Sequence, residues 1–327
     1  MKAHQILEED GKHIIGTYSR LPVVFVKGKG CRLWDVNSRV YLDFLAGIAV
    51  NSLGHCHPKV VCAVRNQTRK LMHVSNLYYT LPQVKLAREL SELSFAGKCF
   101  FCNSGAEANE AAIKLARKYS KVNFGGDRYE IITTTNSFHG RTLATITATG
   151  QEKYRRDFDP LMPGFKYAAY GSVSEVEKAV SKKTCAVLVE PVQAEGGVNV
   201  PPADYLPGLR KLCDEKNLLL MLDEVQTGLG RTGAMFAYQH AGIEPDVMTL
   251  AKALGGGLPI GAMIAKAKAA DVLGPGTHAS TFGGNPVVVS AALAVLKVIR
   301  DEKLHRRAGI LGSHFMEKLN ALKSKHS

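Results

Sequence analysis

The chain has 327 residues, of which 46% are hydrophobic and 22% charged, so its composition is that of an ordinary globular enzyme with room for a large domain and a smaller appendage. No stretch approaches the roughly 20 apolar residues of a membrane span, and the first ten residues lack the apolar core of a secretion signal, so we expect a cytoplasmic protein. The net charge of +13 would suit nucleic acid, but the basic residues are scattered and no nucleic-acid-binding motif accompanies them. We therefore expect no nucleic-acid partner, and the charge equally suits anionic substrates or a phosphate-bearing cofactor.

The first expected element is a small antiparallel meander at residues 22–45, where apolar and polar residues alternate between short turns. Helical periodicity follows at 59–72 and 83–94. Pro58 suits the first position of the earlier helix, where its missing N–H costs nothing.

Short apolar runs then alternate with helical stretches as far as about residue 265. Strand–helix alternation of this kind predicts an α/β fold with a mostly parallel sheet covered by helices. Two helices, at 284–299 and 301–323, are expected after the last run. The expected strands are Cys99–Cys102, Ile131–Thr134, Ala186–Glu190, Leu218–Asp223, Val247–Ala251 and Ile260–Ile264.

The helix expected at 301–323 is amphipathic, yet little sequence follows it. We expect its apolar stripe to have nothing to pack against, as in a small domain that is incomplete. The apolar positions are Leu304, Ile310, Leu311, Phe315, Leu319 and Leu322.

The seven cysteines have no framework spacing and indicate reduced, structural thiols. Cys99 and Cys102 have the CxxC spacing, but strand alternation would place them on opposite faces, which disfavours a metal or redox pair. The motif His55-Cys56-His57 has no matching second ligand pair. The sequence therefore predicts no metal site.

Residues 103–110 follow the first strand of the series and open a helix. Small residues there let backbone N–H groups approach an anion, and the helix N-terminus adds positive potential. A phosphate would fit. Ser104 and Glu107 could equally form a capping box, and both interpretations can hold together.

Three more loops carry side chains suited to a ligand. In the segment Phe138–Thr142, the aromatic ring of Phe138 can stack on a planar cofactor. Arg141 can bind a carboxylate with two parallel N–H donors. The ordinary alternative is that Phe138 is a buried core residue and Arg141 a surface residue. The segment Glu190–Gly197 places two acids after a strand, which could also be a simple acidic loop. The segment His278–Pro286 offers hydroxyls for the edge of a phosphate, or a helix cap.

Lys252 and Asp223 are the most informative residues. Lys252 follows an apolar strand and precedes three glycines, so we expect partial burial, which lowers the pKa of an ammonium group and exposes a neutral, nucleophilic amine. Asp223 ends a neighbouring apolar run. A lysine that forms a Schiff base, paired with an acid that holds a pyridinium nitrogen, is typical of pyridoxal phosphate (PLP) sites. Each residue alone has an ordinary alternative. Together, however, these loops lie at predicted strand ends or helix starts, where α/β sheets bind ligands, and they favour a PLP site.

Taken together, these motifs resemble those of the class III (fold type I) PLP-dependent aminotransferases over about residues 18–299, most of all the acetylornithine branch, with the ornithine branch next. The resemblance implies a large domain with a mostly parallel sheet and a small domain that is incomplete at the C-terminus. The implied domains are an N-terminal segment with the meander (1–55), the PLP-binding domain (56–285) and the start of the small domain (286–327). The matching segments are Asn103–Glu110, Phe138–Thr142, Glu190–Gly197, Leu222–Gly233, Thr249–Ala262 and Thr277–Pro286.

The resemblance also implies roles at the cofactor. Lys252 would carry PLP covalently and Asp223 would pair with the pyridinium nitrogen, so these two are the expected catalytic residues. The remaining implied contacts are Val225 under the ring, Phe138 above it, Gln226 at the ring hydroxyl, Ser104, Gly105 and Ala106 at the phosphate, and Thr281 completing the phosphate site from the neighbouring subunit of a homodimer.

For the substrate, the resemblance implies that Arg141 and Ser280 contact the amino acid and that Tyr18 lies at the mouth of the site. Glu195 matches an acid that masks a second arginine in related enzymes, and this chain has no counterpart of that arginine.

The implied reaction moves the distal amino group of N2-acetyl-L-ornithine to 2-oxoglutarate, giving N-acetylglutamate semialdehyde and glutamate, in arginine biosynthesis. Transamination of ornithine, succinylornithine or 4-aminobutyrate, or PLP binding without catalysis, are the alternatives.

Overall fold

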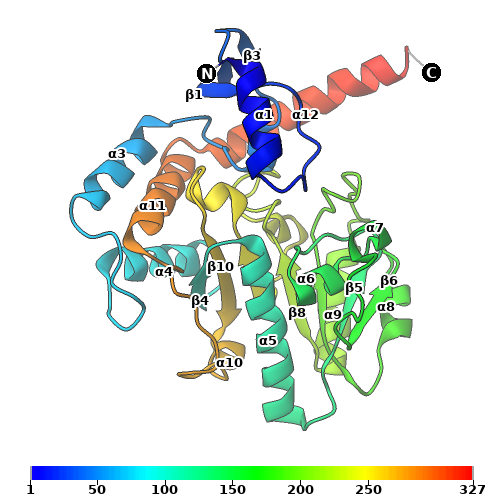
Figure 1. Ribbon diagram of the computed structural model, residues 1–327. Coiled ribbons are helices and arrows are strands. Elements are labelled where there is room, and N and C mark those ends of the chain that lie inside the picture. Colours follow the sequence, from blue (N-terminus) through cyan, green and yellow to red (C-terminus); the bar gives the residue numbers. More distant parts are fainter. Residues whose placement is uncertain (1, 326–327) are drawn as a thin grey trace.

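The computed structural model describes residues 2–325, and a seven-stranded sheet lies at the centre of the fold (Figure 1). The strand order is β4-β10-β9-β8-β7-β5-β6. Strands β5 to β9 pair in parallel, whereas β10 is antiparallel to both of its neighbours, β4 and β9. The strands are β4 (Gly97–Cys102), β5 (Glu130–Thr134), β6 (Phe165–Ala168), β7 (Thr184–Val189), β8 (Leu219–Asp223), β9 (Val247–Leu250) and β10 (Gly261–Lys266).

The expected α/β fold with a mostly parallel sheet is confirmed, and all six expected strands are present. The sequence did not predict β6, a four-residue edge strand interrupted by a lysine. The antiparallel direction of β10 was not predicted either. The connection 251–260 contains only the 3-10 turn η2 (Lys252–Gly255), whereas a parallel return needs a longer crossover, usually a helix.

Helices cover both faces of the sheet, because its strands are apolar on both sides. Strand β8 illustrates the alternation. Leu219 and Met221 belong to the core that packs against α5 (Gly105–Phe124), whereas Leu220 and Leu222 belong to the core on the opposite face.

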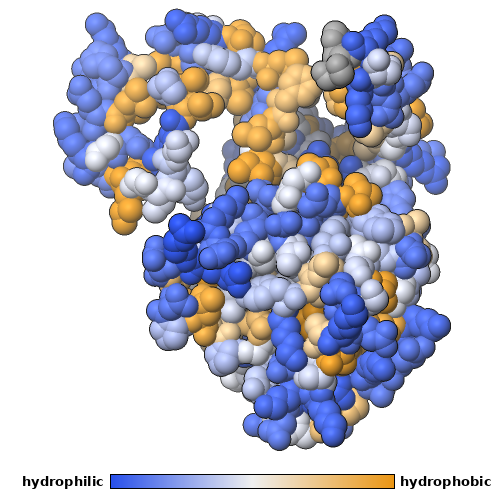
Figure 2. Space-filling view, turned by 90° about the vertical axis from the view of Figure 1, so that its right-hand side faces the viewer, coloured by the Kyte–Doolittle hydropathy of each residue, from blue (hydrophilic) through white to orange (hydrophobic). Residues whose placement is uncertain are grey.

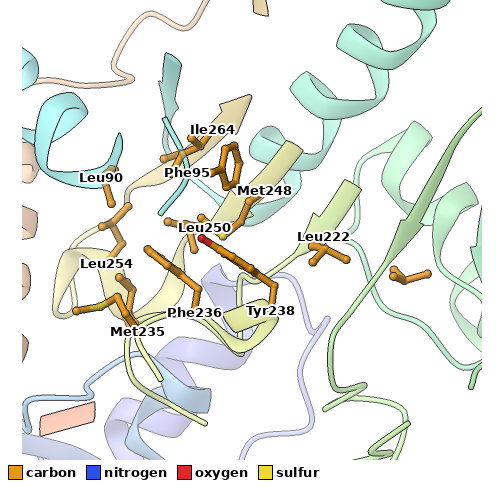
Figure 3. Close-up of a cluster of buried hydrophobic side chains, with 14 of the residues drawn as sticks. Leu90, Phe95, Leu222, Met235, Phe236, Tyr238, Met248, Leu250, Leu254 and Ile264 are labelled. Atoms are coloured by element: carbon orange, nitrogen blue, oxygen red, sulfur yellow. The ribbon is translucent and has the colours of Figure 1, made fainter. Parts of the chain in front are cut away.

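The second core contains residues of α4 (Leu81–Leu93), α9 (Tyr205–Lys216) and α11 (Pro286–Asp301). Figure 3 shows part of it, where Leu222, Met248 and Leu250 from neighbouring strands lie near the rings of Phe236 and Tyr238. Those two rings stack with their centres 6.0 Å apart. This core fixes the strands whose carboxyl ends carry the candidate site.

The expected meander is present as a three-stranded antiparallel sheet. The expected helices at 59–72 and 83–94 correspond to α3 and α4, and Pro58 is the first residue of α3, as predicted. The remaining elements are α1 (Ala3–His13), β1 (Phe25–Lys29), β2 (Arg32–Asp35), β3 (Val40–Leu42), α2 (Ala46–Ala49), α3 (Pro58–Thr68), α6 (Leu143–Ala148), α7 (Glu152–Arg155), α8 (Val173–Ala179), η1 (Ala237–Ala241), α10 (Ala267–Ala270) and α12 (Leu304–Lys323).

Helix α12 contains no buried residue, and its apolar stripe is exposed from Ile310 onward, as expected, whereas Leu304 at its start packs against the core. Ile310 is 72% exposed and Phe315 is 62% exposed. Figure 2 shows apolar residues gathered across the upper part of the molecule, where Figure 1 places the meander and α12, whereas the lower part is mostly polar. Within residues 2–325, no helix is both long and apolar enough to cross a membrane.

Candidate active site

A cavity of about 460 Å³ lies at the carboxyl ends of the central strands. Most of the residues predicted to form a cofactor and substrate site line this cavity, although they come from segments that are far apart in the sequence. The predicted residues brought together are Ser104, Gly105, Ala106, Phe138, Arg141, Glu195, Asp223, Val225, Gln226 and Lys252.

Lys252 is the first residue of η2, directly after β9. Its φ angle of 32° lies in a region that L residues rarely adopt, and such strain is concentrated at functional sites. The side chain is 21% exposed, and its Nζ atom is 3.9 Å from Oε1 of Glu195. Burial lowers the pKa of Lys252, opposed by the negative charge of Glu195. A neutral amine is therefore easier to form here than on the surface.

Asp223 ends β8 and is 4% exposed. Its Oδ2 atom accepts hydrogen bonds from Nδ2 of Asn109 at 2.7 Å and from Nδ1 of His139 at 2.8 Å, because a carboxylate can only accept. Its Oδ1 atom accepts the N–H of Val225 at 3.1 Å. Three donors therefore satisfy this buried carboxylate and fix its orientation.

Asn109 is itself held in one orientation. Its Oδ1 accepts the hydroxyl of Thr249 at 2.8 Å, and its Nδ2 also donates to the carbonyl of His139 at 2.8 Å. The sequence pointed to the segments that contain Asn109 and His139, but not to these two side chains. Their common partner Asp223 comes from a different strand, and no spacing in the sequence reveals that contact.

The candidate anion site lies at the start of α5. Ser104 is the N-cap and accepts the N–H of Glu107 at 3.1 Å, while Glu107 accepts the N–H of Asn103 at 2.6 Å. Ser104 is therefore confirmed as the N-cap, but the reciprocal bond of a capping box is not formed, because Glu107 accepts the N–H of Asn103 and not that of Ser104. This arrangement leaves the N–H groups of Gly105 and Ala106, which have no acceptor within the helix, beside the cavity.

Glu190 follows β7 and holds the loop that carries Phe138. Its Oε1 accepts the N–H of Phe138 at 2.9 Å. Burial, and then the neighbouring Asp223 carboxylate, raise the pKa of Glu190 well above its ordinary value. Glu190 is a further cavity residue whose role the sequence did not reveal.

Arg141 and Glu195, the two residues expected to face the substrate, also line the cavity. Arg141 forms no hydrogen bond or ion pair with any of residues 2–325, so its fork of N–H donors is free. Glu195 instead lies between two cavity residues, Lys252 and Gln226, whose Nε2 donates to Oε1 of Glu195 at 3.4 Å.

Three predicted site residues do not line this cavity. Ser280 and Thr281 line a second cavity, of about 700 Å³, and the Ser280 hydroxyl accepts the N–H of Gly283 at 3.0 Å. Tyr18 is 73% exposed and lines neither cavity. A single copy of the chain thus leaves these three residues outside the site.

The cysteines lie apart from this chemistry. All seven are free, and burial raises the pKa of both Cys99 and Cys102 to about 12. Such thiols stay protonated at neutral pH and are poor metal ligands and redox groups. Among residues 2–325, no cluster of three or more His, Cys, Asp or Glu side chains could hold a metal ion.

Residues 16–327 match the family described as aminotransferase class-III. The chain belongs to this family. It is 53% identical over 96% of its length to an acetylornithine aminotransferase of Caldanaerobacter subterraneus subsp. tengcongensis, and it covers 80% of that relative. An acetylornithine aminotransferase of Methanocaldococcus jannaschii is 51% identical over 100% of this chain, which covers 82% of that relative.

Solved structures agree with this assignment. The ornithine aminotransferase of Toxoplasma gondii superposes with a TM-score of 0.93 at 39% identity, covering 96% of this chain and 76% of its own. The acetylornithine aminotransferase of Elizabethkingia anophelis superposes with a TM-score of 0.87 at 37% identity, and the match covers 99% of this chain and 80% of that one. The chain is thus a PLP-dependent aminotransferase with the fold type I architecture.

The residues present fit PLP. A Cβ atom on Gly105 would lie 2.8 Å from Cγ1 of Val225, so a side chain there would collide with the cavity wall. The phosphate would meet the N-terminus of α5, the pyridine nitrogen would meet the buried anion of Asp223, and Lys252 supplies the amine. One cavity therefore holds all three kinds of group that this cofactor requires.

Proposed function

We propose that this enzyme transfers the distal amino group of N2-acetyl-L-ornithine to 2-oxoglutarate, as a cytoplasmic enzyme of arginine biosynthesis. The observation that carries the proposal is the unpaired Arg141 in the same cavity as Lys252 and Asp223. A free guanidinium fork suits the carboxylate that the amino donor and the oxo acid both carry. Both relatives described above, each more than half identical to this chain, carry the acetylornithine name.

The chain's own residues divide the work as follows. Arg141 binds the substrate carboxylate and so places the amino-bearing carbon near Nζ of Lys252. The amine of Lys252, whose pKa burial lowers, takes the proton from that carbon and later returns one. When bound, PLP supplies a ring that can hold the electron pair left on that carbon. Asp223, fixed by Asn109 and His139, would hold the ring nitrogen of bound PLP.

The expected substrate and cofactor contacts of Ser280, Thr281 and Tyr18 are proposed to come from a second copy of the chain in a homodimer. Support comes from Leu77, which lines the second cavity and is 85% exposed, and from Tyr79, two residues along the chain, which is 99% exposed. Burying such side chains against another copy would be favourable by about 25 cal/mol for each Å² of apolar surface. Thr281 would then complete the partner's phosphate site.

A second candidate donor is ornithine, because the Toxoplasma gondii enzyme that superposes so closely is an ornithine aminotransferase. The two donors differ at the α-amino group, which is acetylated and neutral in acetylornithine and charged in ornithine. Among the residues that line the cavity, Glu190, Glu195 and Asp223 are acidic. Asp223 is bound by its three donors, Glu195 lies near Lys252, and Glu190 accepts the N–H of Phe138, so each of the three acids already has a partner other than a second ammonium group.

The experiment is a comparison of kcat/KM for acetylornithine, ornithine, succinylornithine and 4-aminobutyrate with 2-oxoglutarate as the acceptor. Acetylornithine should be preferred, and glutamate should form in equal amount to the aldehyde product. A higher kcat/KM for ornithine would overturn the choice of donor. Absence of any conversion, with the PLP absorbance unchanged by every donor, would overturn the catalytic role itself and favour a PLP-binding protein.

A further inference from the structure

Arg141 has an aromatic neighbour that the reaction scheme does not use. Its guanidinium carbon lies over the ring of Tyr154, 4.0 Å from the ring centre. The same carbon is 5.6 Å from the centre of the Phe138 ring. Tyr154 is thus the nearer support for a cation that otherwise has no hydrogen-bond or ion-pair partner among residues 2–325.

Tyr154 is held firmly where it lies. It belongs to α7, which begins after the buried Gln151. The Nε2 atom of Gln151 donates to the carbonyls of Asn136 at 3.3 Å and Ser137 at 3.2 Å, immediately before Phe138. The N–H of Asn136 in turn donates to the carbonyl of Gly150 at 3.0 Å. Helix α7 and the loop of Phe138 and Arg141 are therefore one tied unit.

The rings of Tyr154 and Phe138 also meet edge to face, with centres 5.6 Å apart and planes 80° apart. Lys153 adds a second cation, with Nζ 4.7 Å from the centre of the Tyr154 ring. The ring of Tyr154 thus contacts both Phe138, which lies beside the expected cofactor position, and Arg141, which is expected to bind the substrate.

We propose that Tyr154 is a positioning residue that holds the guanidinium of Arg141 ready for the substrate carboxylate. The proposal rests on the assignment of Arg141 in the proposed function. A cation over an aromatic face is attracted to the ring, yet its N–H groups stay free to bind an anion. An arginine fixed before the substrate arrives loses less conformational freedom on binding, which strengthens binding.

The test uses the holoenzyme and N2-acetyl-L-norvaline, which is acetylornithine without its terminal amine and therefore cannot react. Its dissociation constant is measured by titration calorimetry for the wild type, Tyr154→Leu, Tyr154→Phe and Arg141→Ala. Tyr154→Leu should weaken binding roughly 3- to 30-fold, which corresponds to the strength of a cation–aromatic contact. Tyr154→Phe keeps the ring and should stay within about twofold. Tyr154→Met replaces Tyr154→Leu if the leucine variant does not fold.

The double variant Arg141→Ala/Tyr154→Leu shows through which residue Tyr154 acts. If it acts through Arg141, removing the ring should weaken binding no further once the arginine is gone. The kcat/KM for N-acetylputrescine, which lacks the carboxylate, should change little in Tyr154→Leu.

The outcomes separate the two claims. If Arg141→Ala leaves the dissociation constant unchanged, the assignment of Arg141 in the proposed function is wrong. If Arg141→Ala weakens binding but Tyr154→Leu does not, Arg141 stands and the positioning role of Tyr154 is overturned. Equal loss of PLP affinity and ligand affinity in Tyr154→Leu would also overturn it, because Tyr154 would then support Phe138 and the cofactor instead.

Discussion

Nδ1 of His139 donates a hydrogen bond of 2.8 Å to Oδ2 of Asp223 at the base of the cavity, and both side chains are almost completely buried. The same oxygen accepts a second hydrogen bond, from Asn109. A buried carboxylate needs hydrogen-bond donors, and these two also fix its orientation. The arrangement holds the Asp223 side chain where we expect the pyridine nitrogen of PLP to bind.

Replacing Asp223 with Ala should therefore lower kcat by at least about a hundredfold, as expected when a preorganised electrostatic contact is lost. Lys252 is unchanged, so PLP should still bind, as monitored by its visible absorbance. The matched control is Asn109→Ala, which removes one donor but keeps the carboxylate and should lose much less activity. A near-normal rate for Asp223→Ala, or equal losses in both variants, would show that Asp223 is not the electrostatic partner.

Gly105→Ala should weaken PLP binding. The added Cβ would lie 2.8 Å from Cγ1 of Val225, and overpacking of this kind typically costs about 1–3 kcal/mol, more than the gain of about 0.4–1 kcal/mol from replacing a glycine. Equilibrium dialysis of PLP measures the effect. Adding Val225→Ala makes room for the methyl group and should restore part of the affinity, and a double variant that is weaker than both single variants would contradict the steric explanation.

Glu224, next to Asp223, is structural and should make stability depend on pH. Both of its carboxylate oxygens accept backbone N–H groups, from Ala237 at 2.7 Å and Tyr238 at 2.8 Å, and burial nevertheless raises its pKa from 4.5 to about 7. Between these values the native state binds more protons than the unfolded state, so the free energy of unfolding falls as the pH rises.

Glu224→Gln lacks this titration and is the comparison for urea unfolding at pH 5, 6, 7 and 8. The wild type should lose up to about 3 kcal/mol relative to the variant as the pH rises through this range. PLP binding should change little at any of these pH values, because Glu224 does not line the cavity. A difference that stays constant with pH, or that grows in favour of the wild type, would contradict a raised pKa.

Mixing Lys252→Ala with Thr281→Ala subunits tests the proposed shared sites. In a hybrid dimer with shared sites, one active site contains both substitutions, and the other contains an intact Lys252 and an intact Thr281. Random reassembly of equal amounts makes half of the dimers hybrid, so activity should reach about one quarter of the wild type, above the average of the two parents. No gain over the parents after subunit exchange, or a monomer by light scattering with normal PLP binding, would exclude sharing.

The sequence predicted the strands and the residues at their ends for one physical reason. Runs such as 218–223 are buried on both faces and therefore continuously apolar, so a polar residue at the end, such as Asp223, marks the edge of the sheet. The glycines after Lys252 marked a turn in the same way. Such local patterns predict the structure correctly because they depend only on which residues are buried, and not on which distant residues they contact.

Other features could not be predicted because they depend on contacts between distant segments. His139 and Asn109 meet at Asp223 only after three elements pack together. The contact of Tyr154 with Arg141 depends on the short helix α7, whose four residues give no periodic signal. The position of Ser280 outside the cavity depends on how the loop after β10 folds back, which no local pattern specifies.

The central claim is that Lys252 carries the cofactor, and reduction with borohydride tests it most directly. The PLP-loaded enzyme is reduced, digested and mapped by mass spectrometry, with Lys252→Ala treated in parallel. The account predicts one pyridoxyl-labelled peptide, which contains Lys252 and is absent from the variant. A stoichiometric label on any other lysine, or a label that persists in Lys252→Ala, would contradict it.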